Sequence, residues 1–410
     1  MSTYSRKDFL KLAGLASASF LLPKFLRGND AQSEEMMKQL FLSGTNGKRI
    51  VVIQLSGGND GLNTIIPFGD DLYHSNRPSI GLNENQVIRI DDHFSFNGAL
   101  QGIADLHSEG FLSILNNVGY PNPNRSHFRS MDIWQSASDE NKYLQTGWIG
   151  RWLDASCNGN DIRPHLALEV DDTLSLALKG DKVTGLAMKN PSRLELILKD
   201  PLLQKIAGEW KDEEDHHHNV EYLHKTLAEV SKSAGYLHDH LGKNMAKSVY
   251  PQHAFGKQMK VVADLILAGC ETTVYYVSLP GFDTHAGQNG QQNRMLKIYA
   301  DGLKAFADDL KAAGQWDNTL VMTFSEFGRR VKQNASKGTD HGTANVMIFA
   351  GGSLKKKGIL NEAPDLSDLD NGDLRFKVDF RQVYATVLQN WLGTDAEIIL
   401  GQKFGLLDFV

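Results

Sequence analysis

The chain has 410 residues, of which 41% are apolar and 22% are charged, a composition typical of a globular protein and not of a fibrous or disordered one. Its formal net charge of -6 at pH 7 gives no basic field for a phosphate backbone, so no nucleic-acid partner is expected. An anionic ligand would therefore need local positive charge.

Residues 1–31 have the features of an export signal. Arg6 and Lys7 precede an alanine- and serine-rich apolar run that is too short to span a bilayer comfortably. The pattern resembles a twin-arginine signal in which Lys7 replaces the second arginine, and the alternatives are an ordinary export signal or an uncleaved anchor. We expect a periplasmic or otherwise exported protein, recognised by the export machinery, with no transmembrane span in the mature chain.

Residues 45–410 are expected to form a single α/β domain. Five apolar runs rich in β-branched or aromatic residues are predicted to be buried strands: "RIVVIQL" (49–55), "FLSILNNVG" (111–119), "TVYYVSLPG" (273–281), "NTLVMTFSEFG" (318–328) and "NVMIFAGG" (345–352). Helical spacings of three and four lie between and after them, clearest at Leu296, Tyr299, Leu303, Phe306 and Leu310 and again at Phe380, Val383, Val387, Leu388 and Trp391. This alternation predicts a mostly parallel central sheet with helices on both faces, with ligands beyond the carboxyl ends of the strands.

Three other segments have less specific interpretations. A polar stretch at about residues 201–253 is expected to be a helical insertion, and its "DEEDHHH" (212–218) is interpreted as a solvated face more readily than as a metal site. Cys157 and Cys270 each end an apparent helix, which favours small buried thiols over a disulfide. Tyr73 and Arg77, in a predicted surface loop over the site, are candidates for substrate contact.

Residues of metal-ligating type follow three predicted strands and precede a fourth. Asp60 follows the first, Asp283 and His285 follow the third, Glu326 follows the fourth, and His341 precedes the fifth. On an extended segment, Asp283 and His285 point to the same side and can bind one cation. Each residue also has a structural interpretation, as a turn aspartate, a helix-start carboxylate or a core histidine. Their convergence on one edge of the sheet nevertheless predicts a divalent metal site, most simply for zinc, with magnesium, manganese or calcium as alternatives.

A candidate nucleophile follows the second predicted strand. The segment "YPNPNRSHFRSMDIW" (120–134) places Ser126 after a turn and at the start of a helix, where backbone N–H groups favour an anion. Arg125, His127 and Arg129 would supply the positive charge that the acidic chain otherwise lacks. The alternative is that Ser126 is an ordinary helix-capping serine.

Long motifs in this chain resemble a known family. The segments "LSGGNDGLNTIIPFGDDLY", "RSHFRSMDIWQ", "TGWIGRWLD", "GFDTHAGQ", "TFSEFGRRVKQN" and "GTDHGTANVMIFAGG" are similar, in this order, to the exported proteins grouped as domain of unknown function 1501. That family is similar in turn to the alkaline phosphatase and sulfatase superfamily.

The resemblance implies roles for individual residues. It implies metal binding by Asp60, by Asp283 with His285 and by His341, and it implies nucleophilic attack by Ser126. Where the superfamily commonly carries an Asp-His pair, this chain has Glu326 followed by Phe327, so one metal site is expected and a second is weakly supported. The Cys-x-Pro-x-Arg pattern of sulfatases has no match in the sequence.

Two functions follow from these observations. The first is an exported metal-dependent hydrolase of phosphate-type esters, and less readily of sulfate esters, which acts on an anionic ester substrate. The alternative is a non-catalytic exported protein that uses the same metal-containing fold to bind a cell-surface polymer or a partner. The arginines near Ser126 favour the first function, and the phenylalanine at 327 favours the second.

Overall fold

The computed structural model describes residues 47–157, 162–189, 200–201, 218–240 and 245–410. The predicted export signal lies outside the described residues, as does the "DEEDHHH" segment apart from its last histidine. Within the described residues, no helix combines the length and the apolar character needed to cross a membrane. Cys157 and Cys270 are both in the thiol form.

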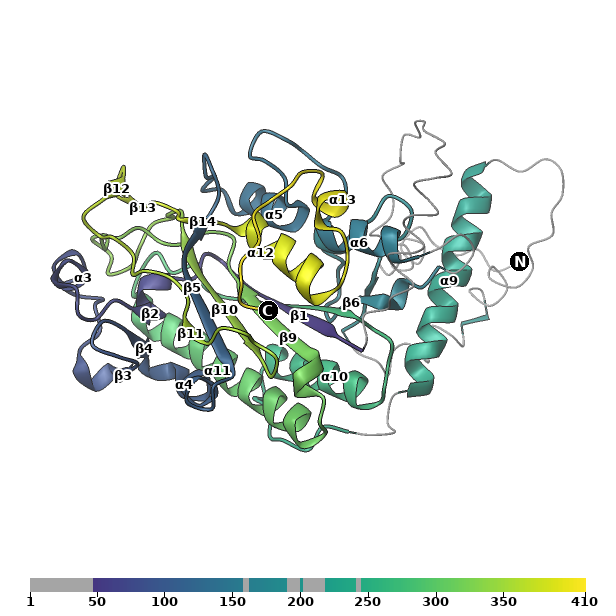
Figure 1. The fold of residues 1–410 in the computed structure, drawn as a ribbon, viewed down its shortest axis with the longest axis horizontal. Helices are drawn as coiled ribbons and strands as arrows, with labels where there is room; N and C mark the ends of the chain where they lie inside the picture. The colour runs from purple at the N-terminus through teal and green to yellow at the C-terminus, as the bar shows by residue number, and fades with distance from the viewer. Residues whose placement is uncertain (1–46, 158–161, 190–199, 202–217, 241–244) are drawn as a thin grey trace.

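A nine-stranded sheet forms the centre of the fold (Figure 1). Its strand order is β11-β5-β10-β9-β1-β8-β6-β7, and β14 pairs with the far end of β5. The strands are β1 (Arg49–Ser56), β5 (Leu112–Gly119), β6 (Ala167–Glu169), β7 (Leu186–Ala187), β8 (Val274–Pro280), β9 (Thr319–Phe324), β10 (Asn345–Gly351), β11 (Gly358–Ile359) and β14 (Val378–Asp379). All five predicted strands are thus confirmed, although β9 ends four residues before the predicted run does.

The sheet is mostly parallel, as predicted, with one exception that matters for the site. Strand β10 runs antiparallel to both of its neighbours, β5 and β9. The start of β10 therefore lies at the same edge of the sheet as the carboxyl ends of β1, β8 and β9. This direction explains how His341, which precedes a strand, can meet residues that follow strands.

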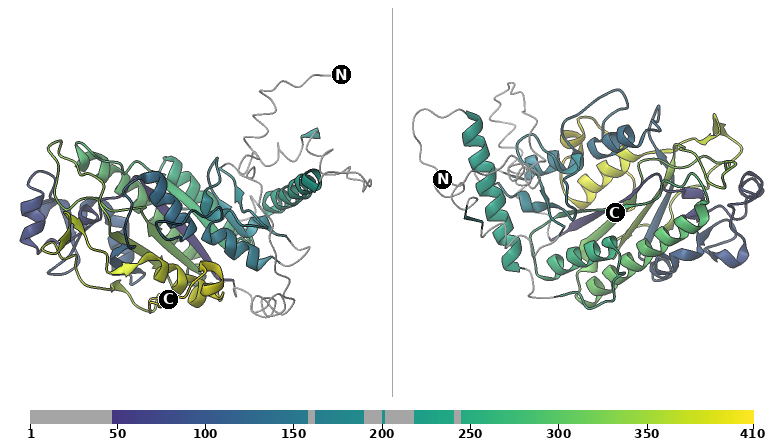
Figure 2. Two further views of the ribbon diagram at one scale, coloured as in Figure 1. Left: turned by 90° about the horizontal axis from the view of Figure 1, so that it is seen from above. Right: turned by 180° about the vertical axis from the view of Figure 1, so that it is seen from behind.

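Helices cover both faces of the sheet (Figure 2). On β1, Val51 and Ile53 belong to one buried cluster while Ile50 and Val52 belong to the other, as the alternation of side chains along a strand requires. The first cluster is completed by α4 (Gln101–Ser108), α10 (Ala254–Leu267) and α11 (Gln288–Ala312). The second is completed by α5 (His127–Ser136), α6 (Trp148–Ser156), α12 (Phe380–Thr386) and α13 (Ala396–Leu400).

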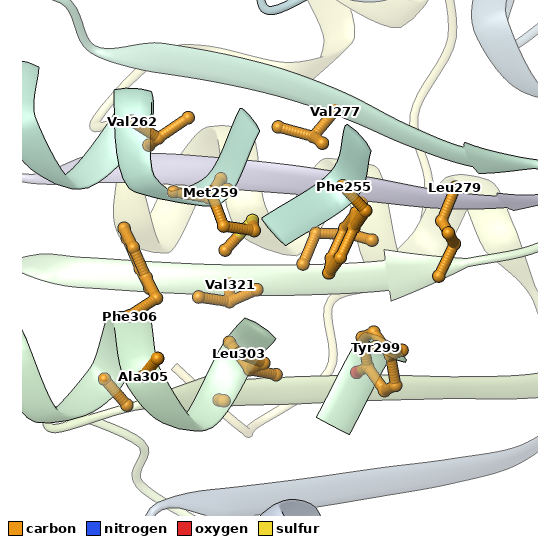
Figure 3. Packing of buried hydrophobic residues seen from close by; sticks show 14 of the residues in the cluster. Phe255, Met259, Val262, Val277, Leu279, Tyr299, Leu303, Ala305, Phe306 and Val321 are labelled. Atoms are coloured by element: carbon orange, nitrogen blue, oxygen red, sulfur yellow. The ribbon is translucent and has the colours of Figure 1, made fainter. Parts of the chain in front are cut away.

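Figure 3 shows how closely the first cluster is packed. Side chains of α10 and α11 lie against side chains of β8 and β9. The helix residues are Phe255, Met259 and Val262 of α10 and Tyr299, Leu303, Ala305 and Phe306 of α11, and the strand residues are Val277 and Leu279 of β8 and Val321 of β9. Burying each of the larger apolar side chains contributes about 1.5–3 kcal/mol relative to exposure. The two long helices are therefore firmly fixed to the sheet whose edge carries the candidate site.

The remaining elements surround this centre. They include α3 (Asp71–Asn76), β2 (Ile65–Ile66), β3 (Val87–Arg89), β4 (Ser95–Asn97), the β12–β13 hairpin (Leu369–Asp370, Asp373–Leu374) and α9 (His218–His240), which lies beyond β6 at one end of the sheet. The 201–253 segment is described only in part, and α9 is the described helix within it. Trp148 and Trp152 of "TGWIGRW" are buried in the core. Tyr73 and Arg77 are also buried, so the expectation that they contact substrate from a surface loop is wrong.

Candidate metal centre

Two glycines after β1 bring three loops together at the carboxyl edge of the sheet. Gly57 and Gly58 have φ angles of 116° and 74°, a region that side chains disfavour. A Cβ on Gly57 would lie 2.5 Å from the backbone nitrogen of Asp283, and one on Gly58 would lie 2.2 Å from the ring of Phe327. The loop after β1 can approach the loops after β8 and β9 this closely because both positions lack a side chain.

Asp283, which follows β8, is the centre of a cluster of histidines. Its Oδ1 lies 3.0 Å from Nε2 of His285 and 3.3 Å from Nε2 of His341, and its Oδ2 lies 3.5 Å from Nε2 of His127. Three imidazoles from three different segments thus meet one carboxylate. The sequence brought Asp283, His285 and His341 together as predicted candidates, and the structure adds His127.

Each of the three imidazoles has its Nδ1 next to an oxygen acceptor. Nδ1 of His127 lies 2.9 Å from Oε1 of Glu326, and Nδ1 of His341 lies 2.8 Å from the backbone oxygen of Arg125. Nδ1 of His285 lies 3.3 Å from Oδ1 of Asp340. A carbonyl or carboxylate oxygen can only accept, so each Nδ1 donates, and in the neutral form of a ring the Nε2 lone pair is left facing Asp283.

The three Nε2 atoms and the carboxylate of Asp283 therefore lie close together. Nε2 of His285 and Nε2 of His341 lie only 3.0 Å apart, and Nε2 of His127 is buried without a hydrogen-bond partner in the described part of the chain. Among the described residues, His127, Asp283 and His341 each offer one ligand atom within 4.8 Å of the others. Ligand atoms in a tetrahedral zinc site lie about 3.3 Å apart, given bonds of about 2.0–2.1 Å. These residues therefore fit a divalent cation with a preference for nitrogen and oxygen ligands.

The electrostatics of the cluster favour a bound cation. Although burial opposes the charged form of Asp283, the hydrogen bond and charge of Arg329, together with the neighbouring His341 and His285, outweigh it and lower the pKa to about 2. Burial lowers the pKa of His341, which keeps that ring neutral near pH 7. The hydrogen bond to Glu326 raises the pKa of His127, so this ring attracts positive charge, whether a proton or a metal ion.

Arg329 fixes the position of the Asp283 carboxylate. Its guanidinium is 2% exposed and donates at 2.7 Å to Oδ1 of Asp283, and it also donates to the carbonyl oxygens of Gly57, Gly58, Thr339 and Phe282. A single planar group with five donors thereby joins the loops after β1, β8 and β9. The carboxylate is held in place by the fold itself.

The other two predicted metal-binding carboxylates lie outside the imidazole cluster. Asp60 is fully buried, with Oδ2 at 2.6 Å from Nη1 of Arg77 and in contact with the side-chain amide of Gln288. Glu326 is also fully buried and accepts at 2.8 Å from the backbone N–H of Gly57 in addition to supporting His127. A ligand role for Asp60 or Glu326 stays a prediction. Oδ2 of Asp60 is paired within the protein, whereas its Oδ1 is buried with no hydrogen-bond partner among the described residues.

Ser126 is held next to the cluster by its two neighbours. The carbonyl of Arg125 accepts from His341, and the ring of His127 reaches Asp283. Ser126 is the N-cap residue of α5 and is exposed, but its hydroxyl makes no capping hydrogen bond. A hydroxyl that capped the helix would be engaged with the backbone, whereas this one is available for a ligand.

The two arginines near Ser126 have different surroundings. The side chain of Arg125 is 42% exposed and forms an ion pair with Asp373 of the β12–β13 hairpin. Arg129 is buried, donates to the carbonyl oxygens of Asp139, Glu140 and Lys142, and packs against Tyr143. Arg129 therefore holds the loop after α5, while Arg125 lies beside the candidate nucleophile. Substrate binding by either arginine stays a prediction.

Two members of the site were not predicted in these roles. His127 was expected to supply positive charge to an anion, and Asp340 was not singled out. His127 reaches the loops after β8 and β9 because of the direction in which the chain runs from β5 into α5. Local residue spacing does not predict this direction. Asp340 stands directly before His341, and adjacency in an irregular segment gives no indication that its partner is His285.

Taken together, these features define an α/β protein with a histidine- and aspartate-rich cluster at one edge of its sheet. The family model described as "Protein of unknown function (DUF1501)" matches residues 113–407, and the chain belongs to this family. No curated protein matches the sequence significantly.

Several solved structures share the general arrangement of the fold. One is the zinc complex of the C-terminal periplasmic domain of EcEptC from Escherichia coli, at 10% identity and a TM-score of 0.38, with 75% of this chain and 74% of that one covered. The PsFucS1 sulfatase from Pseudoalteromonas sp. has 11% identity and a TM-score of 0.40, covering 91% and 74%. A protein in the alkaline phosphatase superfamily from Vibrio parahaemolyticus has 10% identity and a TM-score of 0.40, covering 98% and 78%. These values limit the likeness to the arrangement of the fold.

Proposed function

We propose that the protein is an exported, metal-dependent hydrolase of phosphate-type esters whose metal centre is formed by His127, Asp283, His285 and His341. The observation that supports this proposal is the convergence of three Nε2 atoms on one carboxylate, with Nε2 of His285 and His341 only 3.0 Å apart. Two Nε2 atoms at this distance need either a shared proton or a cation between them, and a cation satisfies all three rings and the carboxylate at once. Zinc is the simplest candidate, because it prefers imidazole nitrogen and carboxylate oxygen.

The bound cation would act as a Lewis acid toward the ester and would lower the pKa of a nearby hydroxyl. In this scheme the hydroxyl of Ser126 gives its proton to water and its oxygen forms a bond to phosphorus, while the ester oxygen leaves and takes up a proton from water. A second water molecule then releases the phosphoryl group from the serine. The N-terminus of α5, which has ten residues, favours negative charge beside Ser126. Arg125 places a half-exposed guanidinium next to the same residue.

The surroundings of each histidine support this assignment. Glu326 and the carbonyl of Arg125 fix the tautomers of His127 and His341, so that both rings present Nε2 to the cation. Arg329 holds Asp283 in its ionised form. Three of the four ligands are thus oriented before any ion arrives, which reduces the cost of binding it.

A second function is favoured by the number of ligands. Zinc sites with four protein ligands are commonly structural, whereas catalytic sites keep a position open for water or substrate. If all four side chains stayed bound, the protein would be a non-catalytic member of this fold that binds a cell-surface polymer or a partner. The exposed Asp283 and His285, at 49% and 46%, are unusual for a structural site and favour the hydrolase.

Metal analysis and the Ser126→Ala variant together test the hydrolase proposal. Protein purified without chelators should contain about one zinc per chain. With a panel of activated phosphate monoesters and diesters, Ser126→Ala should abolish turnover while metal content and melting temperature stay unchanged. If wild-type protein with metal bound hydrolyses neither phosphate nor sulfate esters, the non-catalytic function replaces the hydrolase.

Export is tested separately, because it depends on residues 1–31. If Arg6 and Lys7 form the recognition pair of a twin-arginine signal, replacing both with glutamine should leave folded precursor in the cytoplasm. The comparison is a variant that weakens the apolar run, which should impair export by either route. Unchanged export of the double glutamine variant would contradict the twin-arginine assignment.

A further inference from the structure

The four candidate ligands differ in how firmly the protein holds them. The imidazoles of His127 and His341 are 26% and 23% exposed, and their Nδ1 atoms bond a fully buried carboxylate and a backbone carbonyl at 2.9 and 2.8 Å. His285 is 46% exposed, and its Nδ1 lies 3.3 Å from Asp340, whose own side chain is 60% exposed. The hydrogen bond that orients His285 is thus the longest and the most open to water.

The backbone around His285 adds to this contrast. His285 lies in the loop between β8 and α11, which is flanked by Gly281 and Gly287, both with positive φ angles of 117° and 53°. Asp283, in the same loop, is fixed by the buried Arg329. The chain at His285 is instead held through the side-chain amide of Asn334, which donates at 3.0 Å to the backbone carbonyl of His285 and at 3.2 Å to Asp340. His285 therefore belongs to a small polar unit with Asn334 and Asp340 at the surface.

We propose that His285 is an exchangeable ligand of the metal centre, while His127, Asp283 and His341 are its permanent ligands. This proposal rests on the proposed function in one respect, namely that the site holds a divalent cation. In this arrangement His127, Asp283 and His341 would hold the cation throughout, and an oxygen of an anionic ester would take the position that Nε2 of His285 gives up. Nδ1 of His285 would keep its hydrogen bond to Asp340 throughout, so the exchange needs no proton transfer.

The exchange resolves the conflict between four protein ligands and a catalytic role. The three permanent residues form a group in which each ligand atom lies within 4.8 Å of the others, and Nε2 of His285 adds a fourth nitrogen at 3.0 Å from Oδ1 of Asp283 and from Nε2 of His341. Three protein ligands and one open position is the pattern of catalytic zinc sites. His285 would close the site when substrate is absent and open it when an anion competes for the position.

Cobalt-substituted protein can test this assignment without any knowledge of the substrate. Visible absorption of Co²⁺ reports its coordination number and donor atoms, and inorganic phosphate serves as the probe for an incoming anion. His285→Ala should still bind one Co²⁺ per chain with affinity reduced by no more than about 100-fold, with a spectrum changed from that of the wild type. His341→Ala, the matched control, should lose Co²⁺ binding by a much larger factor.

Phosphate titrations separate exchange from simple addition. In the wild type, phosphate should convert the spectrum toward that of the phosphate complex of His285→Ala, because both then carry the same protein ligands. The variant should bind phosphate about tenfold more tightly, since no ligand has to be displaced. Added imidazole should restore a wild-type-like spectrum to the variant, and His285→Gln provides a second variant if the alanine protein folds poorly.

Three results would overturn the proposal. One is loss of Co²⁺ by both His285 variants as complete as in His341→Ala, which would make His285 a permanent ligand. Another is a His285→Ala spectrum identical to that of the wild type, which would mean that His285 is not a ligand. Wild-type protein that binds no Co²⁺ would overturn the metal centre as well, which distinguishes failure of the proposed function from failure of the exchange.

Discussion

Asp60 and Asp283 each follow a strand of the central sheet, yet the protein uses them in opposite ways. Asp60 is fully buried and is neutralised by Arg77 at 2.6 Å. Asp283 is 49% exposed and, although Arg329 touches it at 2.7 Å, it still faces three imidazoles. One carboxylate is paired inside the protein, and the other keeps capacity for an external cation. Because both carboxylates pair with a buried arginine, the difference shows that position after a strand selects candidates, while exposure and the facing imidazoles decide which of them can reach a metal.

Breaking the internal pair should have the largest effect on stability. Arg77→Met removes the partner of a buried carboxylate and should lower the free energy of unfolding by about 3–5 kcal/mol. Urea titration of the metal-free protein measures this value. Zinc content of the folded fraction should be close to that of the wild type, and a loss of zinc without a loss of stability would mean that Asp60 belongs to the metal centre.

Changing the exposed carboxylate of Asp283 should weaken zinc binding strongly and affect stability little, the reverse of the Arg77→Met variant. Asp283→Asn keeps the size of the side chain but removes the charge, so zinc affinity should fall by at least about 100-fold, or 2.7 kcal/mol. Unfolding of the metal-free protein should change little, because a half-exposed ion pair contributes weakly to stability. Competition with a chelator of known affinity gives the first quantity, and urea titration gives the second.

Glu326 sharpens the comparison because it is buried like Asp60 but supports a histidine of the cluster. Glu326→Gln should reduce zinc affinity by about 10- to 100-fold through the orientation of His127. Asp60→Asn is the matched control, since it also neutralises a buried carboxylate. Equal effects of both changes on zinc affinity would contradict the separation of the two carboxylates.

The smallest expected effect is on the pH dependence of the metal-free protein. The pKa of Asp283 in the folded protein, about 2, lies below the ordinary value of 3.8 for an aspartate, so its ionised form stabilises the native state at pH values above 3.8. This contribution should be lost as the pH falls from 3.8 toward about 2. Because the Asp283 side chain is half-exposed, the contribution should stay below about 1 kcal/mol. The melting temperature of wild type should therefore fall more steeply with acid than that of Asp283→Asn. Parallel curves would argue against the lowered pKa.

The sequence predicts the strands and the proximity of Asp283 to His285 well because both follow from local patterns. Strand β1 follows from one apolar run, and the pairing of Asp283 with His285 follows from their separation of two residues. The contribution of His127 was not predicted as a ligand role, because it depends on how α5 packs on the sheet. Nor does any local pattern say that Arg77, 17 residues from Asp60, would turn inward and neutralise it.

The guanidinium of Arg329, shared by three loops, has a consequence for how the proposed metal would be acquired. Because the hydrogen bonds of Arg329 hold Asp283 whether or not an ion is present, loss of the ion should leave the loops at this edge of the sheet in place. Metallation is then uncoupled from folding, unlike in zinc fingers, where metal affinity is folding energy. The protein could therefore fold without metal and bind its ion later. The ion bound would then depend on which metals are locally available and on their intrinsic order of affinity.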